Sequence, residues 1–313
     1  MNIEDVLRET LFDMAVEEEP PPPSRFLQAR RRRRRQGLVL AMAAGSVAVL
    51  AAGSTFAVQS LSPPAPVLSK PVGQRPSPAR PAVLTVKEGL RLSETLSLLA
   101  SATGKPAKDF VRAAEDGEAL GLPAYAKGRL EGFAFPGTYE VSPSASPGEV
   151  IAAMVTRFKR AAEDVELPEG ARRLHRTPLE VLTVASIIQA ETFDKRDMPK
   201  VARVIYNRLN RRPAMRLQLD STVMYGLKTY GVRATSKDLT SSSPYNTYRH
   251  AGLPPGPIGN PGVDAIEAAL KPATGPWLYF VITDPGKRVM KFAASEAEFM
   301  ELAEERAKNL RKR

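Results

Sequence analysis

The 313-residue sequence contains no cysteine and only two histidines, His175 and His250. The lack of cysteine excludes disulfides, thiolate zinc sites, iron–sulfur clusters and a cysteine nucleophile. Two histidines are also too few for a three-histidine metal site. We therefore expect no metal and no cofactor, with a calcium site built from scattered carboxylates as the open alternative.

Acidic residues are too few to balance the basic ones, 34 against 45, so the chain carries a net charge of +11. This excess favours an anionic partner without naming it. Six arginines form one run, Arg30–Arg35, whereas the charge of +10 on residues 59–313 is spread along the chain. A nucleic-acid-binding domain needs its basic residues clustered, so we expect no nucleic-acid partner.

Charged residues and proline are both absent from the 22 residues at positions 37–58. As a helix this segment would reach about 33 Å, enough to cross a bilayer core of about 30 Å. The run Arg30–Arg35 directly precedes it, which places the N-terminus in the cytoplasm by the positive-inside rule. We predict a single-pass anchor in the cytoplasmic membrane with an extracytoplasmic catalytic part. A cleaved signal peptide and a buried helix of a soluble protein are the alternatives.

The segments that flank the predicted transmembrane helix have the composition of unfolded chain. Residues 1–36 hold eight arginines, seven acidic residues and a proline run, which predicts a disordered cytoplasmic tail. Residues 59–82 contain seven prolines, which predicts a stiff, extended linker. The folded part is therefore expected at about 83–313.

The first part of the folded region, residues 83–165, has the pattern of a small α+β module. Alternation at 83–86 and at 138–141 predicts two strands, and Ser93 is expected to cap a helix between them. A second helix is predicted near 107–114. Ser146 and Glu149 form a capping box that opens a third.

The second part, residues 166–313, contains a carboxylate in an unusual position. Thr177, Pro178 and Glu180 predict a helix start, and Glu191 then falls on or beside the apolar face of that helix. A charge there is costly unless it is paired or used in chemistry. A buried glutamate bonded to an arginine or to backbone amides is the structural alternative.

Further polar and aromatic residues follow on shorter elements. A helix is predicted at about 199–211, and Asp220 is expected to cap a short helix that Gly226 ends. Residues 244–257 are irregular by composition. Their rings and amides suit sugar binding, although such residues taken alone are more often ordinary loop residues. The chain is expected to end with a hairpin over 277–293 and a helix capped by Ser295.

Six segments resemble, in chain order, the signatures of the YceG-like family, whose best-known members are endolytic murein transglycosylases. They are Leu130–Tyr139, Val184–Thr192, Lys200–Leu209, Met215–Gly226, Tyr245–Tyr248 and Gly252–Ile258. The resemblance runs from about residue 83 to the C-terminus. It implies an α+β fold in which a small LysM-like, glycan-binding module at 83–165 is joined to a mixed α+β catalytic domain at 166–313.

The resemblance also implies an activity, namely cleavage of peptidoglycan glycan strands between MurNAc and GlcNAc with a 1,6-anhydro-MurNAc end. The family's catalytic acid is the second carboxylate of an Ile-Glu-x-Glu-Thr element, which maps onto Glu191. The first carboxylate is replaced by Gln189, which keeps its size and hydrogen bonding. The candidate substrate-binding residues are Gln218, Asp220, Tyr225, Tyr245, Asn246 and Tyr248.

One carboxylate is enough for this chemistry, because the C6 hydroxyl of the sugar is the nucleophile and Glu191 can act first as acid and then as base. Two alternatives stay open: a hydrolase that uses Glu191 and Asp220, and a non-catalytic peptidoglycan-binding scaffold if Gln189 marks a decayed site. The expected partners are glycan strands and membrane-bound cell-wall synthases, and the expected state is a monomer.

Overall fold

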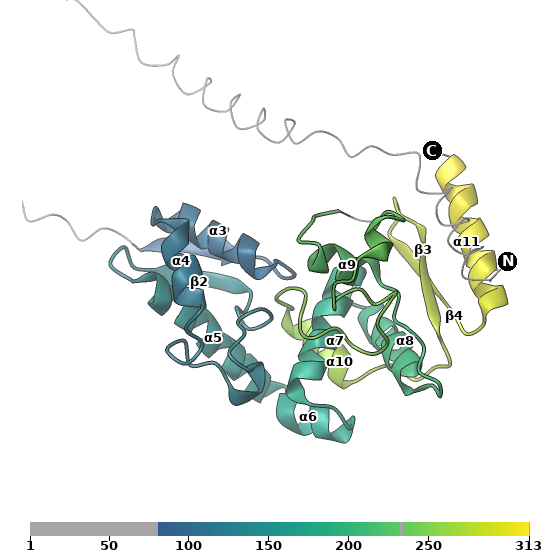
Figure 1. Ribbon diagram of the computed structural model, residues 1–313, viewed down its shortest axis with the longest axis horizontal. Coiled ribbons are helices and arrows are strands. Elements are labelled where there is room, and N and C mark those ends of the chain that lie inside the picture. The colour runs from purple at the N-terminus through teal and green to yellow at the C-terminus, as the bar shows by residue number, and fades with distance from the viewer. Residues whose placement is uncertain (1–80, 232–233, 313) are drawn as a thin grey trace, which may run out of the picture. The chain divides into compact units, whose positions relative to one another are not determined.

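The computed structural model describes residues 81–231 and 234–312 of the chain (Figure 1). The predicted tail, the predicted transmembrane segment 37–58 and most of the predicted linker lie outside the described residues. In the part that the structure describes, no helix is both long and apolar enough to cross a bilayer. The described residues belong to one compact unit, and its fold is the predicted mixture of α and β elements.

The first half of this unit has the order β-α-α-β. Strand β1 (Ala82–Val86) pairs antiparallel with β2 (Gly137–Val141), and α3 (Leu92–Thr103) and α4 (Ala107–Ala114) lie between them in the chain. These elements confirm the predicted ones to within about one residue. The exception is the cap of α3, where the N-cap is Arg91 and Ser93 is already helical.

Helix α5 (Pro147–Asp164) supplies much of the core of this half. The predicted capping box is present, since the backbone N–H of Glu149 donates to Ser146 Oγ at 3.2 Å and the backbone N–H of Ser146 donates to Glu149. Phe158 of this helix is fully buried and packs edge-on against Phe133, with ring centroids 4.8 Å apart. Burial of such rings is the main stabilising contribution to a small core.

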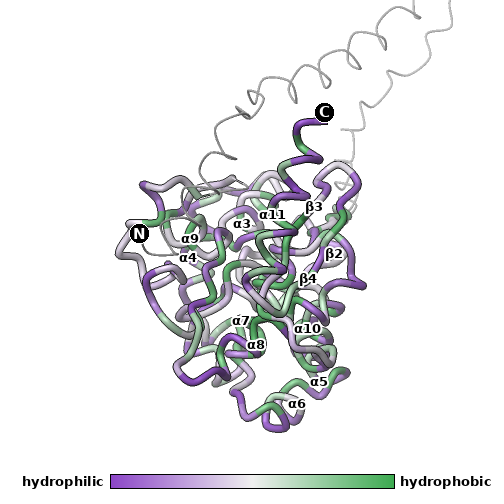
Figure 2. Tube along the Cα trace, turned by 90° about the vertical axis from the view of Figure 1, so that its right-hand side faces the viewer, coloured by the Kyte–Doolittle hydropathy of each residue, from purple (hydrophilic) through white to green (hydrophobic). Residues whose placement is uncertain are grey.

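The second half is built around α7 (Pro178–Glu191), and every residue from Val181 to Ile188 is buried. The expectation of one apolar face was therefore too narrow, because α6 (Leu167–Arg173), α8 (Met198–Asn210) and α10 (Val263–Leu270) all pack on α7. A helix that is apolar all round belongs in a core. Figure 2 shows the hydrophobic stretch of α7 with hydrophilic segments around it.

The C-terminal segment folds as predicted. Strands β3 (Tyr279–Asp284) and β4 (Val289–Ala293) form an antiparallel hairpin, and α11 (Glu296–Arg311) packs against it. Ser295 caps α11 by accepting the backbone N–H of Glu298 at 3.2 Å. Strand β3 of this hairpin also contacts α8.

The two halves share one continuous hydrophobic core. A buried asparagine joins them, because Asn260 Oδ1 accepts the backbone N–H groups of Gly132 and Ala134, both at 3.0 Å. The boundary near residue 165 therefore stays a prediction of the sequence pattern.

Candidate active site

Glu191 is the last residue of α7, and its half-buried side chain faces the start of α9 (Asp220–Gly226). Ser221 Oγ donates a hydrogen bond of 2.6 Å to Glu191 Oε1. The residues from Val181 to Ile188 are buried, so the packing of α7 fixes where its last turn and this carboxyl lie. Ser221 is a site residue that the sequence pattern did not single out.

Burial raises the pKa of Glu191 to about 7, and the neighbouring charge of Asp220 acts in the same direction. The hydrogen bond from Ser221 opposes this rise because it stabilises the ionised form. A carboxyl with this pKa holds its proton for a large fraction of the time at neutral pH. It can therefore donate that proton and accept another without a change of environment.

Removing the Ser221 hydroxyl tests this electrostatic arrangement. In a Ser221→Ala variant we expect the pKa of Glu191 to rise further, since the bond that favours the carboxylate is lost. A reaction that needs protonated Glu191 would then persist to higher pH. The pH dependence of kcat/KM measures this, and a descending limb that stays in place or moves to lower pH would contradict the assignment.

Asp220 does not cap α9 as predicted, because the N-cap is Leu219 and Asp220 is the first helical residue. Its carboxylate is held by other groups: the hydroxyl of Tyr248 donates to Oδ1 at 2.7 Å and the backbone N–H of Ala234 to Oδ2 at 3.2 Å. Burial and this contact both raise the pKa of Tyr248. Tyr248 and Asp220 are thus brought together beside Glu191.

A second half-buried carboxyl, Glu131, lies at the opposite end of α9 and was not singled out from the sequence. Its oxygens accept the backbone N–H of Leu92 at 2.9 Å and the hydroxyl of Tyr225 at 3.0 Å. Burial raises the pKa of Glu131 to about 7. Its position in the segment 130–139 was the available signal, but its partners come from distant parts of the chain.

The ring of Tyr225, on α9, pairs with the ring of Tyr245, and the two ring centroids are 4.8 Å apart. Ser221 and Tyr225 are four residues apart, so they share one face of the helix at a rise of about 6 Å. The structure therefore brings Tyr225 and Tyr245 to the same helix face as Ser221.

The remaining predicted residues shape the loops around this face. Asn246 is fully buried, and its amide donates to the carbonyls of Leu239 and Ser241 at 2.9 and 2.8 Å. Gln218 adopts a left-handed backbone conformation, with φ of 48°, and its N–H donates to the carbonyl of Thr247 at 3.2 Å. Because the amide of Asn246 is buried and bonded to this loop, we expect Asn246 to position the loop and not to touch the substrate itself.

Arg208 of α8 fixes the segment that leads into α9. This buried guanidinium donates to the carbonyl of Leu217 at 2.7 Å and to that of Leu278 at 2.6 Å, and it lies over the ring of Tyr279. Burial lowers the pKa of Arg208 to about 10, so it stays charged at neutral pH. In the sequence, Arg208 was noted only as part of the family-like segment 200–209.

The side chain of Gln189 and the side chain of Glu191 have different hydrogen-bond partners. Its Oε1 accepts the backbone N–H of Gly262, the N-cap of α10, at 3.0 Å. This bond ties the end of α7 to the start of α10, and a glutamate in this position could accept the same N–H. The position is therefore occupied by a residue with a structural contact of its own.

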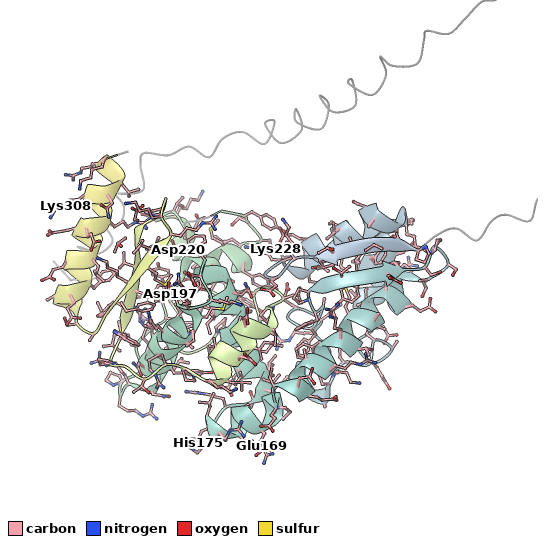
Figure 3. All side chains as sticks on the ribbon, turned by 180° about the vertical axis from the view of Figure 1, so that it is seen from behind. Glu169, His175, Asp197, Asp220, Lys228 and Lys308 are labelled. Atoms are coloured by element: carbon pink, nitrogen blue, oxygen red, sulfur yellow. The ribbon has the colours of Figure 1, made fainter. Side chains whose placement is uncertain are left out.

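The described residues contain no group of three or more histidine, aspartate or glutamate side chains placed to hold a metal ion. His175 follows the end of α6, well away from Asp220 (Figure 3). His250 is exposed on a loop. The titratable groups gathered around α9 are instead carboxyls and tyrosines.

A model of the YceG-like family matches residues 39–305. The endolytic murein transglycosylase of Bacillus subtilis (strain 168) is 34% identical over 223 residues, which are 66% of this chain and 60% of that protein. The endolytic murein transglycosylase of Streptococcus pneumoniae serotype 2 is 34% identical over 161 residues, 50% of this chain and 28% of that protein. The chain thus spans less than two thirds of the length of these relatives.

Among solved structures, a yceG-like protein from Listeria monocytogenes is similar to this chain. The two are 30% identical and superpose with a TM-score of 0.64, over 72% of this chain and 76% of that one. The family model covers most of the sequence, including every element of the site described above. The chain therefore belongs to the YceG-like family.

Proposed function

We propose that this protein is a lytic transglycosylase that cleaves peptidoglycan glycan strands internally, between MurNAc and GlcNAc. Two relatives carry the name endolytic murein transglycosylase, which supports the substrate and the type of reaction. The observation that carries the proposal is Glu191, a half-buried carboxyl with its pKa raised to about 7 at the end of a rigid helix.

In the first half of the reaction Glu191 acts as a general acid. A glycosidic oxygen is a poor leaving group unless it is protonated as its bond to the anomeric carbon breaks. Protonated Glu191 supplies that proton and becomes the carboxylate. Ser221 then stabilises the new charge through its 2.6 Å hydrogen bond.

In the second half Glu191 acts as a general base. The C6 hydroxyl of the same MurNAc attacks the anomeric carbon, and Glu191 takes the proton of that hydroxyl. A bond between O6 and C1 replaces the glycosidic bond, and the product is a 1,6-anhydro-MurNAc end. Glu191 is protonated again, so atoms and charges balance without a second carboxyl or an activated water.

Asp220 is the group through which a hydrolase could work instead. A glycosidase pairs its acid with a second carboxylate that activates water or attacks the sugar. Here both oxygens of Asp220 accept hydrogen bonds, from Tyr248 and from the backbone of Ala234. We therefore assign Tyr248 to holding Asp220 in place, and Asp220 to raising the proton affinity of Glu191 through its charge.

The glycan strand is proposed to bind along α9. Tyr225, Tyr245 and Tyr248 offer ring faces, and Gln218 offers an amide, for contacts with sugars. The hydroxyls of Tyr225 and Tyr248 already donate to Glu131 and Asp220. The β-α-α-β order of the first half supports the assignment of a LysM-like module that helps to hold the strand.

The cellular setting is proposed from the sequence. An anchor at 37–58, with the N-terminus in the cytoplasm, would hold the enzyme close to the outer surface of the cytoplasmic membrane. There it would act as a monomer on glycan strands made by neighbouring membrane-bound synthases.

A substitution at position 189 tests whether Gln189 marks an active site that has lost its activity. In a Gln189→Glu variant we expect the rate of strand cleavage to stay within about threefold of wild type, because the glutamate keeps the bond to the backbone of Gly262. Initial rates on the same strands measure this. A gain of more than tenfold would mean that wild type is an impaired enzyme.

The proposed function is tested with the full-length protein in detergent and uncrosslinked glycan strands of known length. Endolytic cleavage predicts that strands of intermediate length appear first, without early accumulation of disaccharides. Binding without any change in strand length would favour the non-catalytic scaffold. Early release of terminal disaccharides would contradict internal cleavage.

A further inference from the structure

Arg91 lies directly before α3, and its half-buried side chain is held between two aromatic rings. Its guanidinium carbon is 5.4 Å from the ring centroid of Tyr225 and 4.5 Å from that of Tyr230. Tyr225 is fixed in turn, because its hydroxyl donates to Glu131. An arginine stacked on rings has a defined orientation, with its N–H donors at the edge of the guanidinium plane.

The guanidinium of Arg91 has no ion-pair partner within 4.0 Å among residues 81–231 and 234–312. Two carboxyls lie nearby, and both are engaged by other groups. Glu94 accepts the backbone N–H of Arg91 at 2.9 Å. Glu131 accepts from Leu92 and Tyr225, and its pKa of about 7 leaves it partly neutral at physiological pH. The positive charge of Arg91 is therefore incompletely balanced.

Arg91 is connected to the proposed catalytic centre through one face of α9. Ser221, which binds Glu191, and Tyr225, which contacts Arg91, are one helical turn apart on that face. A strand that follows this face from Glu191 would therefore reach Tyr225 and then Arg91.

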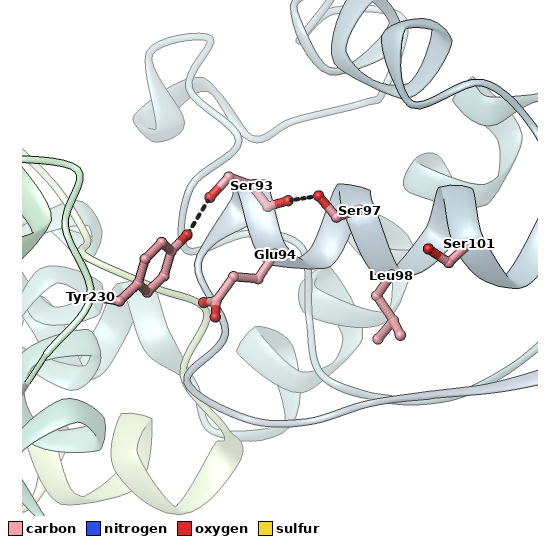
Figure 4. A pocket seen from close by; sticks show the side chains of 6 residues that line it. All are labelled: Ser93, Glu94, Ser97, Leu98, Ser101 and Tyr230. Carbon is pink, nitrogen blue, oxygen red and sulfur yellow. Dashed lines mark hydrogen bonds between the residues drawn. The ribbon is translucent and has the colours of Figure 1, made fainter. Parts of the chain in front are cut away.

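Next to Arg91 the surface is hollowed. An open pocket of about 540 Å³ runs along α3, and Tyr230, which is 61% exposed, stands at one end with its hydroxyl 3.1 Å from Ser93 Oγ (Figure 4). Its lining is Ser93, Glu94, Ser97, Leu98, Ser101 and Tyr230. A chain that leaves the face of α9 at Arg91 thus finds space and hydroxyl groups beyond it.

We propose that Arg91 binds a carboxylate carried by the glycan strand, at the end of the binding face away from Glu191. The inference rests on the proposed function, since it names a feature of that substrate. Two sources share this chemistry. Intact strands carry carboxylates on their stem peptides, and strands stripped of peptides carry the free lactyl carboxylate of MurNAc. Either can accept two parallel hydrogen bonds from a guanidinium.

Binding to three kinds of strand tests the proposal, with the full-length Glu191→Gln protein used to prevent cleavage. The strands are peptide-bearing, stripped by an amidase, or stripped and then converted to neutral lactyl amides. With Arg91→Gln added, we expect the dissociation constant to rise about tenfold for strands with the recognised carboxylate and to stay unchanged for neutral strands. A loss on peptide-bearing strands alone identifies the stem peptide, and a loss on stripped strands alone identifies the lactyl group.

Two further variants separate charge from packing. Arg91→Lys keeps the charge without the planar fork. We therefore expect its dissociation constant for strands with the recognised carboxylate to lie between those of wild type and Arg91→Gln. Arg112→Gln removes an arginine from an exposed position on α4 and should leave all three dissociation constants unchanged.

An equal loss on neutral and charged strands would overturn the proposal and give Arg91 a packing role, and so would no loss on any strand. Cleavage of strands by the wild-type protein is measured in parallel. If wild type binds carboxylate-bearing strands through Arg91 but cuts none, the proposed function fails and the carboxylate site stands.

Discussion

Replacing Glu191 with glutamine is expected to lower the rate of strand cleavage by about 10²–10⁴-fold, the usual contribution of a general acid. Glutamine keeps the size of the side chain and can still accept the hydrogen bond from Ser221. It cannot transfer a proton, so both halves of the proposed reaction fail. Initial rates with uncrosslinked strands at pH 6 and pH 8 measure the effect.

The matched control is Glu267→Gln, which removes a carboxylate from an exposed position on α10 and should leave the rate unchanged. Folding can be checked in the same variants. Because burial raises the pKa of Glu191 from 4.5 to about 7, wild type loses stability as the pH rises through that interval. The Glu191→Gln protein should therefore be at least as stable as wild type at pH 8. Retention of more than a tenth of the wild-type rate would remove Glu191 from its assigned role.

Replacing Arg208 with methionine is expected to lower the free energy of unfolding by about 3 kcal/mol. The methionine fills similar space but leaves the buried carbonyl of Leu217 and the half-buried carbonyl of Leu278 without their donor. A hydrogen bond from a charged group to a buried acceptor contributes about 1.5–3 kcal/mol. Because Leu217 lies just before α9, we also expect reduced cleavage at temperatures where the variant is folded.

Denaturant unfolding of the variant and of Arg211→Met measures this effect. Arg211 is exposed at the end of α8, and its replacement should cost less than about 0.5 kcal/mol. If both variants lose the same small amount, the buried hydrogen bonds of Arg208 contribute less than proposed and α9 is held by apolar packing.

The elements that local signals determine were predicted from the sequence. These are the capping boxes at Ser146 and Thr177, the helix cap at Ser295 and the hairpin before it. In each of them the bonded groups are close together in the sequence. Such signals need no knowledge of tertiary structure. Two short helices were missed: α6 has only seven residues with Gly170 among them, and α10 has eight.

The partners in the site could not be predicted in this way. Ser221 meets Glu191 across 30 residues, and Tyr225 meets Glu131 across 94 residues. Asp220 fitted a helix cap by its position, yet Tyr248, 28 residues away, and the backbone of Ala234 take its carboxylate instead. Such pairings depend on how α7, α9 and the loops pack, which no local pattern encodes.

The burial of α7 shows the same limit. Its sequence was interpreted as having one apolar face, whereas eight consecutive residues are buried because helices pack on several sides of it. This burial matters for chemistry. It places Glu191 at the end of a rigid element in an environment that raises its pKa, which is the condition for a carboxyl that both donates and accepts a proton.

The central claim is that the C6 hydroxyl of the sugar, and not water, displaces the glycosidic oxygen under control of Glu191. Cleavage in ¹⁸O-labelled water, with the new ends read by mass spectrometry, tests it most directly. We predict ends that are lighter than a reducing end by one water molecule, contain no ¹⁸O, and are absent with Glu191→Gln. Reducing ends that carry one ¹⁸O would contradict the claim and make the enzyme a hydrolase.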